Sequence, residues 1–200
     1  MTINQTIRDQ VTDQIRNEVV SGRFPAGQPL REREFANRYG VSNGPVRDAF
    51  LQLAQEGFLA YQANRGVTVR QPPSPENQEF IISLRQQIEA FVIQDKLDRF
   101  RDEETIRPVA ETLKHLKAAC VIGEVADIAV KDMAFHQAIL QACGGSDFLP
   151  IWKWLCSQMM LIYSRLDDYM QVYEEHQTIF EALQNGKKDA VISAIKANIR

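Results

Sequence analysis

The chain has 200 residues, 44% of them hydrophobic, which is enough for two small domains that each bury a core. No window approaches the roughly 20 apolar residues of a membrane-spanning helix, and the first residues show no signal-peptide pattern. Three cysteines without a Cys-x-x-Cys pair argue against a disulfide framework or a zinc finger. We therefore expect a cytoplasmic protein with no membrane partner.

Charge is distributed unevenly along the chain. The net charge of -3 by itself argues against a nucleic-acid partner. Residues 1–70, however, contain nine arginines, no lysine and seven acidic residues, whereas the remainder contains 14 basic and 19 acidic residues. The basic part is the N-terminal one, so any contact with nucleic acid is expected there.

Three helices are predicted in the first 60 residues. Apolar residues recur every four positions from Ile7 to Val19, the period of an amphipathic helix. A loop with two prolines and a glycine follows at 24–29, before a short helical run over 30–39. Gly40 ends that run, and a third helix begins after Ser42, a residue suited to cap it, and continues to about residue 56.

A hairpin and a linker complete the organisation. The β-prone runs 58–61 and 67–69 flank a turn-forming Asn and Gly, which predicts a β-hairpin. The fold class is therefore mainly α: a winged helix-turn-helix over 1–70, a proline-rich linker over 71–77, and an all-α bundle over 78–200. Helical periodicity in the bundle predicts six helices, at about 78–98, 104–119, 124–142, 147–170, 172–185 and 187–199.

The start of the third helix holds the first candidates for DNA contact. In a helix-turn-helix the second helix of the motif enters the major groove with its N-terminal residues at the base edges. Asn43 can pair with adenine and Arg47 with guanine, while Ser42 and the first amides can hold phosphate. Gly44 and Pro45 are poor helix formers, and a purely structural helix has little reason to begin with them.

Three more arginines surround this helix start in the chain. Arg31 and Arg33 open the preceding helix, and Arg65 lies at the hairpin tip. Each alone fits a solvated surface charge, which is the usual place of an exposed arginine. Taken as a set, the three favour a DNA-binding surface.

The N-terminal part resembles the GntR family of bacterial transcription regulators, in its FadR-like branch. The matching segments follow one another in order within about 55 residues: IRNEVVSG (15–22), PAG (25–27), LREREFA (30–36), GVSNGPVRDA (40–49), LAQEG (53–57) and NRG (64–66). The resemblance implies a homodimer on a pseudo-palindromic operator, more often as a repressor than as an activator. It also implies DNA contacts by Arg33, Ser42, Asn43, Arg47 and Gly66. The family usually has Arg or Lys at the position of Asn43, so a different base preference is expected there.

A metal site is a candidate in the C-terminal part. Asp132 and His136 are four residues apart, so both project from one helix face and can ligate one ion. A hydrogen-bonded pair on the helix surface is the better explanation of the spacing alone. The resemblance to a helical, FCD-type effector domain changes this, because Asp132, His136 and His176 match its metal-binding motif and imply zinc or nickel. Asn198 replaces a further histidine, and its neutral oxygen weakens the binding of either metal.

Arg85 and Glu89 are candidates for effector binding. Their spacing of four residues also fits an ion pair on a helix surface. The resemblance places them at a position that faces the effector cavity. Arg85 is then expected to hold the carboxylate of a small organic-acid effector, since a guanidinium matches that group.

Two other classes of function were weighed. Asp132, His136 and His176 with an open fourth position also suit a metal-dependent enzyme, but no general base accompanies them. A ligand-independent DNA-binding protein fits poorly with a basic excess of two and a larger helical part. The sequence therefore favours an effector-controlled DNA-binding regulator that is not an enzyme.

Overall fold

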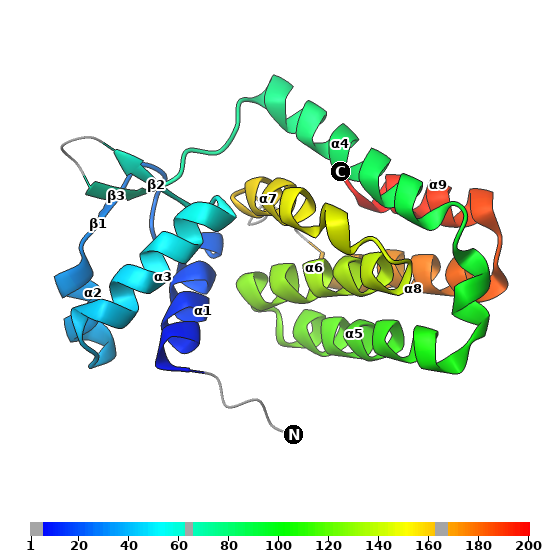
Figure 1. Cartoon of the computed structure of the whole chain (residues 1–200), viewed down its shortest axis with the longest axis horizontal. Coiled ribbons are helices and arrows are strands. Elements are labelled where there is room, and N and C mark those ends of the chain that lie inside the picture. The colour runs from blue at the N-terminus through cyan, green and yellow to red at the C-terminus, as the bar shows by residue number, and fades with distance from the viewer. Residues whose placement is uncertain (1–5, 63–65, 163–167) are drawn as a thin grey trace.

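The computed structural model describes residues 6–62, 66–162 and 168–200. An N-terminal half of three helices and a small sheet adjoins a larger half made of helices (Figure 1). The mainly α fold class, a winged helix-turn-helix followed by an all-helical part, is thus confirmed. None of the described helices is long and apolar enough to cross a membrane.

The N-terminal helices follow local signals in the sequence. Helix α1 (Ile7–Val20) begins with a reciprocal capping box between Thr6 and Asp9. Helices α2 (Glu32–Tyr39) and α3 (Asn43–Glu56) end at glycines in the left-handed conformation. Ser42 is the N-cap residue of α3, as expected, although its side chain makes no capping hydrogen bond.

The sheet contains the expected hairpin and one strand more. Strands β2 (Leu59–Gln62) and β3 (Gly66–Val69) pair antiparallel, and β1 (Pro29–Leu30) pairs with the other edge of β3. The sequence analysis assigned these two residues to a loop and a helix start. A strand of two residues that begins with proline is too short to show a periodicity. It forms through its pairing with β3, where Pro29 faces Thr68, 39 positions further along the chain.

The helical half begins inside the proline-rich segment. Helix α4 (Pro75–Ile93) starts three residues earlier than expected, at Pro75. Proline is tolerated in the first turn of a helix, because the N–H that it lacks would have no hydrogen-bond partner within the helix at that position. A 3₁₀ turn, η1 (Leu97–Arg101), connects it to α5 (Glu103–Ile122). Helix α6 (Val125–Ala142) agrees closely with the expected range.

The single helix expected over 147–170 is wrong. A 3₁₀ turn, η2 (Ser146–Phe148), leads into α7 (Leu149–Met160), and α8 (Tyr169–Asn185) begins after a break. The Asp168 carboxylate accepts hydrogen bonds from the first free amides of α8, which marks a separate helix start. Helix α9 (Lys188–Asn198) ends the bundle.

The two halves share buried apolar surface. The core of the N-terminal half contains residues of α1, α3 and the sheet, and also Ala126, Ala129 and Met160 from α6 and α7. A second core fills the helical half around the fully buried Phe135 and Trp152. Because α6 and α7 contribute side chains to the core of the N-terminal half, a displacement of either helix would change the packing of that core.

Leu53 tests the core of the N-terminal half. Its side chain is fully buried, so Leu53→Ala should lower the free energy of unfolding by about 2–5 kcal/mol. Leu51, on the same helix but 44% exposed, is the matched control, and Leu51→Ala should cost less than about 1 kcal/mol. Urea unfolding followed by circular dichroism measures both, and equal effects would contradict this assignment of the core.

Candidate functional site

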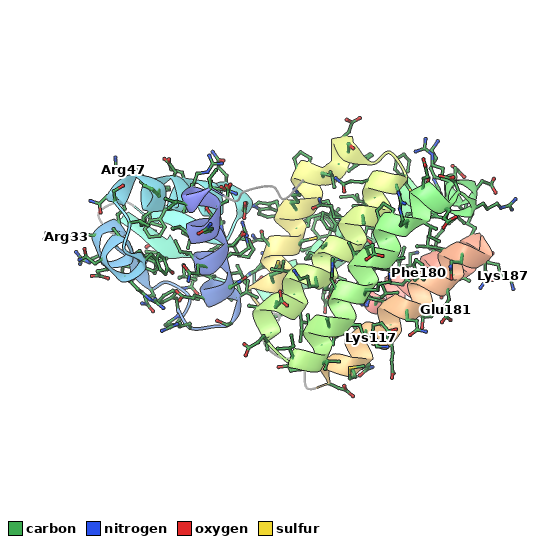
Figure 2. The ribbon with its side chains drawn as sticks, turned by 90° about the horizontal axis from the view of Figure 1, so that it is seen from below. Arg33, Arg47, Lys117, Phe180, Glu181 and Lys187 are labelled. Carbon is green, nitrogen blue, oxygen red and sulfur yellow. The ribbon has the colours of Figure 1, made fainter. Side chains whose placement is uncertain are left out.

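The start of α3 is an exposed polar surface. Ser42, Asn43 and Gly44 are exposed, Pro45 is half-buried, and Arg47 is exposed on the next turn. The buried residues of α3, among them Val46 and Phe50, lie on its opposite face. Figure 2 shows Arg33 and Arg47 at the end of the N-terminal half that faces away from the helical half.

Arg47 is held by an acidic partner that the sequence analysis did not consider. Its Nη2 lies 3.1 Å from Oε2 of Glu32, and its Nε lies 3.2 Å from both carboxylate oxygens. Hydrogen bonding to Glu32 raises the pKa of Arg47. The pair is exposed, so it orients the guanidinium while adding little stability.

The remaining candidates for DNA contact are placed differently. Arg31, the N-cap residue of α2, is 77% exposed with Glu34 at 3.7 Å. Gly66 opens β3 with φ +76°, a conformation that other residues rarely adopt. Arg65 lies outside the described residues. Arg33 and Arg47 therefore lie at the same end of the N-terminal half (Figure 2).

A second cluster lies deep in the helical half, where Asp132 and His136 on α6 meet His176 on α8. The three side chains are buried, and their ligand atoms all lie within 4.8 Å of one another. Oδ1 of Asp132 lies 3.3 Å from Nε2 of His176 and 3.8 Å from Nε2 of His136. Burial excludes the alternative of an ordinary pair on a helix surface.

Glu89 lies behind this cluster and is itself fully buried. Its carboxylate accepts hydrogen bonds from Nδ1 of His136 at 2.7 Å, Nε1 of Trp152 at 2.8 Å and Nε of Arg85 at 2.9 Å. Burial alone would raise the pKa of Glu89, but the charges of His136 and Arg85 outweigh it and lower the pKa to about 2. Glu89 is therefore ionised and can only accept.

The hydrogen bonds determine which histidine nitrogens face the cluster. His136 donates from Nδ1 to Glu89, and His176 donates from Nδ1 to the carbonyl of Val172 at 2.7 Å. Nε2 of His136 then lies 2.9 Å from Oδ1 of Asn198, and Nε2 of His176 lies 3.3 Å from Oδ1 of Asp132. A histidine whose outer nitrogen is held by an acceptor, with Nε2 left for an ion, is the usual arrangement at metal centres.

The charges of the cluster favour a cation among its members. Burial lowers the pKa of His176, but attraction to Asp132 outweighs this, and the pKa is raised above its ordinary value. Burial acts on Asp132 in the opposite sense, yet His176 and His136 keep its pKa below the usual range. A divalent ion bound among these groups would meet the same negative charge. Ligands of a tetrahedral zinc lie about 3.3 Å apart, which matches the 3.3 Å between Asp132 and His176, whereas His136 lies 3.8 Å from Asp132.

Asn198 completes the rim of the cluster from the end of α9. Its Oδ1 lies 2.9 Å from Nε2 of His136, and its amide nitrogen donates to Oε2 of Glu175 at 3.3 Å. Arg200 in turn donates to the other oxygen of Glu175. The Asn198 oxygen therefore faces the position where the family resemblance expects an imidazole.

A cavity of about 260 Å³ opens beside the cluster. Asp132, Asn198 and Arg85 line it, together with apolar side chains such as Ile81, Met133, Met159 and Ile162. Arg85 is 2% exposed, and its Nη2 has no hydrogen-bond partner in the described ranges. Its Nη1 is 3.7 Å from the sulfur of Met159. An ion pair at a helix surface is thus excluded for Arg85 and Glu89.

One residue of the site gave no signal in the sequence, and another has a different role. Trp152 could not be found, because its role depends on a contact with Glu89 on α4. The role of Glu89 differs from the one expected. It holds His136 and Arg85 in place and does not itself line the cavity. The i,i+4 spacing indicated that Arg85 and Glu89 meet, although it could not show that they are buried.

Comparison with known families now identifies the class of protein. A family model described as bacterial regulatory proteins, gntR family, matches residues 7–69. A second model, the FCD domain, matches residues 80–200, which is more than half of the chain. The chain therefore belongs to the GntR family of transcription regulators with an FCD domain. It is a DNA-binding regulator and not an enzyme.

Known relatives match over nearly the whole chain. The "Probable D-xylose utilization operon transcriptional repressor" of Paenarthrobacter nicotinovorans is 28% identical, over 97% of this chain and 86% of the relative. The "Gluconate operon transcriptional repressor" of Bacillus subtilis is 22% identical, over 94% and 80%. Among solved structures, E. coli McbR/YncC is 17% identical with a TM-score of 0.78 over 98% and 94% of the two chains. A putative GntR regulator from Rhodococcus sp. RHA1 is 21% identical with a TM-score of 0.71 over 96% and 93%.

Glu89→Gln tests the buried network. The substitution keeps the shape of the side chain but removes the charge that compensates Arg85, so the free energy of unfolding should fall by about 3–5 kcal/mol. Asp98→Asn removes one partner of the exposed pair with Arg101 and should cost less than about 1 kcal/mol. Chemical unfolding compares the two variants, and similar small losses would show that Glu89 compensates no buried charge.

Proposed function

We propose that this regulator is a repressor whose operator binding is controlled by a small organic acid, held in the FCD domain beside a divalent metal ion. Residues 1–70 bind DNA, 71–77 form the linker, and 78–200 bind the effector and dimerise, in the cytoplasm. The observation that carries the proposal is that one cavity is lined both by Asp132, a member of the buried cluster with His136 and His176, and by Arg85, whose Nη2 has no hydrogen-bond partner in the described residues.

The proposed DNA contacts are the exposed groups around α3. Arg31, Arg33, Arg47 and Arg65 supply positive charge, and Ser42, Asn43, Gly44, Pro45 and Gly66 let the backbone approach the duplex. Arg47 and Asn43 are suited to base edges, and the other arginines to phosphates. The similarity of the chain to named repressors supports repression as the outcome.

The proposed metal ligands are Asp132, His136, His176 and Asn198. Two imidazoles favour zinc or nickel, and the oxygen of Asn198 weakens either compared with a third imidazole. Glu89 would fix the orientation of His136, and the Val172 carbonyl that of His176. When bound, the ion supplies positive charge and open coordination positions at the wall of the cavity.

The effector is proposed to be a carboxylate. A buried guanidinium nitrogen without a partner is unfavourable, and an acid in the cavity would relieve it with charge-assisted hydrogen bonds. The apolar side chains of the cavity suit the carbon skeleton of the same ligand. Glu89 contributes by holding Arg85 through its Nε, which leaves the end of the guanidinium for the acid.

A homodimer is supported by an exposed apolar surface on α4 and α7. Phe91 is 62% exposed on α4 and stacks edge-on with Phe148, and Ile151 and Trp154 are exposed on α7. The two helices lie side by side in the helical half (Figure 1). Exposed aromatic patches of this kind mark protein interfaces, and a two-fold dimer would place two α3 helices on one pseudo-palindromic operator.

Arg47→Ala should weaken operator binding by roughly 1–3 kcal/mol and relax specificity at one base pair in each half-site, because Arg47 is proposed to read a base. Binding to an operator selected from a random duplex pool measures both effects. Arg101→Ala, which removes an even more exposed arginine in the helical half, should leave affinity and specificity unchanged. A uniform loss over all sequences would instead make Arg47 a phosphate contact.

A His136→Ala/His176→Ala double variant tests the metal. It should contain less than about a tenth of the metal of the parent by elemental analysis, because both nitrogen ligands are gone. Operator affinity should remain close to that of the parent, while release of DNA by the effector is lost. His115→Ala removes a histidine outside the cluster and serves as the control. Unchanged metal content in the double variant would place the ion elsewhere.

A further inference from the structure

Gln158 on α7 belongs both to the cavity and to the boundary between the two halves. Its side chain is 3% exposed and forms part of the cavity wall. Its Nε2 donates to the carbonyl oxygen of Gly57 at 3.1 Å. Gly57 is the C-cap residue of α3, the helix whose other end carries Arg47. One amide group therefore connects the cavity wall to the recognition helix.

Gly57 packs closely against two side chains of α7. A Cβ atom at this position would lie 2.6 Å from Nε2 of Gln158 and 2.7 Å from Oγ of Ser157. Gly57 also has φ +96°, a backbone conformation that favours glycine. Both the backbone conformation and the close approach of α7 therefore require glycine at this position. Because no side chain separates α3 from α7, a displacement of Gln158 acts directly on the backbone at the end of α3.

The hydrogen bonds of Gln158 leave its amide nitrogen no spare donor. Nε2 carries two hydrogens, one directed to Gly57 and the other to the Ser157 hydroxyl at 3.0 Å. A ligand that accepts from this nitrogen must replace one of the two. Met159, the next residue, has its sulfur against Arg85, so α7 also contacts the proposed carboxylate site.

We propose that Gln158 is the residue that couples occupancy of the cavity to the recognition helix. An acid bound in the cavity takes a hydrogen bond from the Gln158 amide, the bond to Gly57 is given up, and α3 loses its support on α7. This inference rests on the proposed control by an effector. A single hydrogen bond is large enough for the purpose, since tenfold release of DNA corresponds to a coupling of about 1.4 kcal/mol.

The first test needs no ligand. Gln158→Met keeps the length of the side chain and removes the donor. Hydrogen exchange of the amides at 57–59 in the full-length protein should become about tenfold faster in this variant. Gln171→Met is the matched control, because Gln171 lines the same cavity but its side chain donates to Glu175, away from α3. Equal exchange at 57–59 in Gln158→Met and the parent would overturn the inference, whatever the ligand is.

The second test uses succinate, citrate, gluconate and hexanoate as probes, each in the presence of Zn²⁺. An acid that binds the parent and lowers its operator affinity at least tenfold should bind Gln158→Met within about threefold, yet lower its operator affinity less than twofold. Gln177→Met, at a glutamine of α8 outside the cavity whose side chain donates to Glu181, should still release DNA. If the acid releases DNA from Gln158→Met as fully as from the parent, the coupling role of Gln158 is refuted, while control by the acid still stands. If none of the acids binds the parent, the organic-acid function is refuted, and the exchange experiment still decides the role of Gln158.

Discussion

A buried carboxylate holds the helical half in its arrangement. An ionised Glu89 in an apolar interior is strongly unfavourable unless several donors compensate it. Arg85 on its own helix, His136 on α6 and Trp152 on α7 supply them, so α4, α6 and α7 are held in one register by two oxygen atoms. The same constraint turns Nε2 of His136 away from Glu89, toward Asn198 and Asp132, and leaves Nη2 of Arg85 without a hydrogen-bond partner in the described residues. The site and the packing therefore depend on one group.

Helix α7 extends this constraint to the DNA-binding half. Trp152 contacts Glu89 near one end of the helix, and Gln158 and Met160 contact the N-terminal half near the other. Helix α7 therefore links the buried carboxylate to the boundary with the N-terminal half. At the far end of α3, Arg47 is held by Glu32 in an exposed pair that DNA can replace at small cost. Glu32 therefore orients Arg47 through an ion pair that is too weak to prevent Arg47 from contacting another partner.

Much of the fold follows from signals that lie within a few residues of each other. The capping box at Thr6, the glycine after α2 and the four-residue apolar repeats locate most helices, because helix starts, ends and buried faces are set by neighbours in the chain. Strand β1 and the break between α7 and α8 were missed. Strand β1 depends on pairing with β3, and the apolar run through α7 continues past Met160 with no proline or glycine to end it.

The features of the site also fall into those that local sequence signals predict and those that depend on tertiary packing. The sequence by itself determined the DNA-binding motif, the family and the candidate ligands Asp132, His136 and His176, because a motif is a property of residue types and spacing. Only the tertiary structure decided that Arg85 and Glu89 are buried, and that Gln158 reaches Gly57 from 101 positions away. Spacing within a helix states which residues share a face. Whether that face meets water, a cavity or another helix depends on the packing of segments distant in the chain, which no local pattern records.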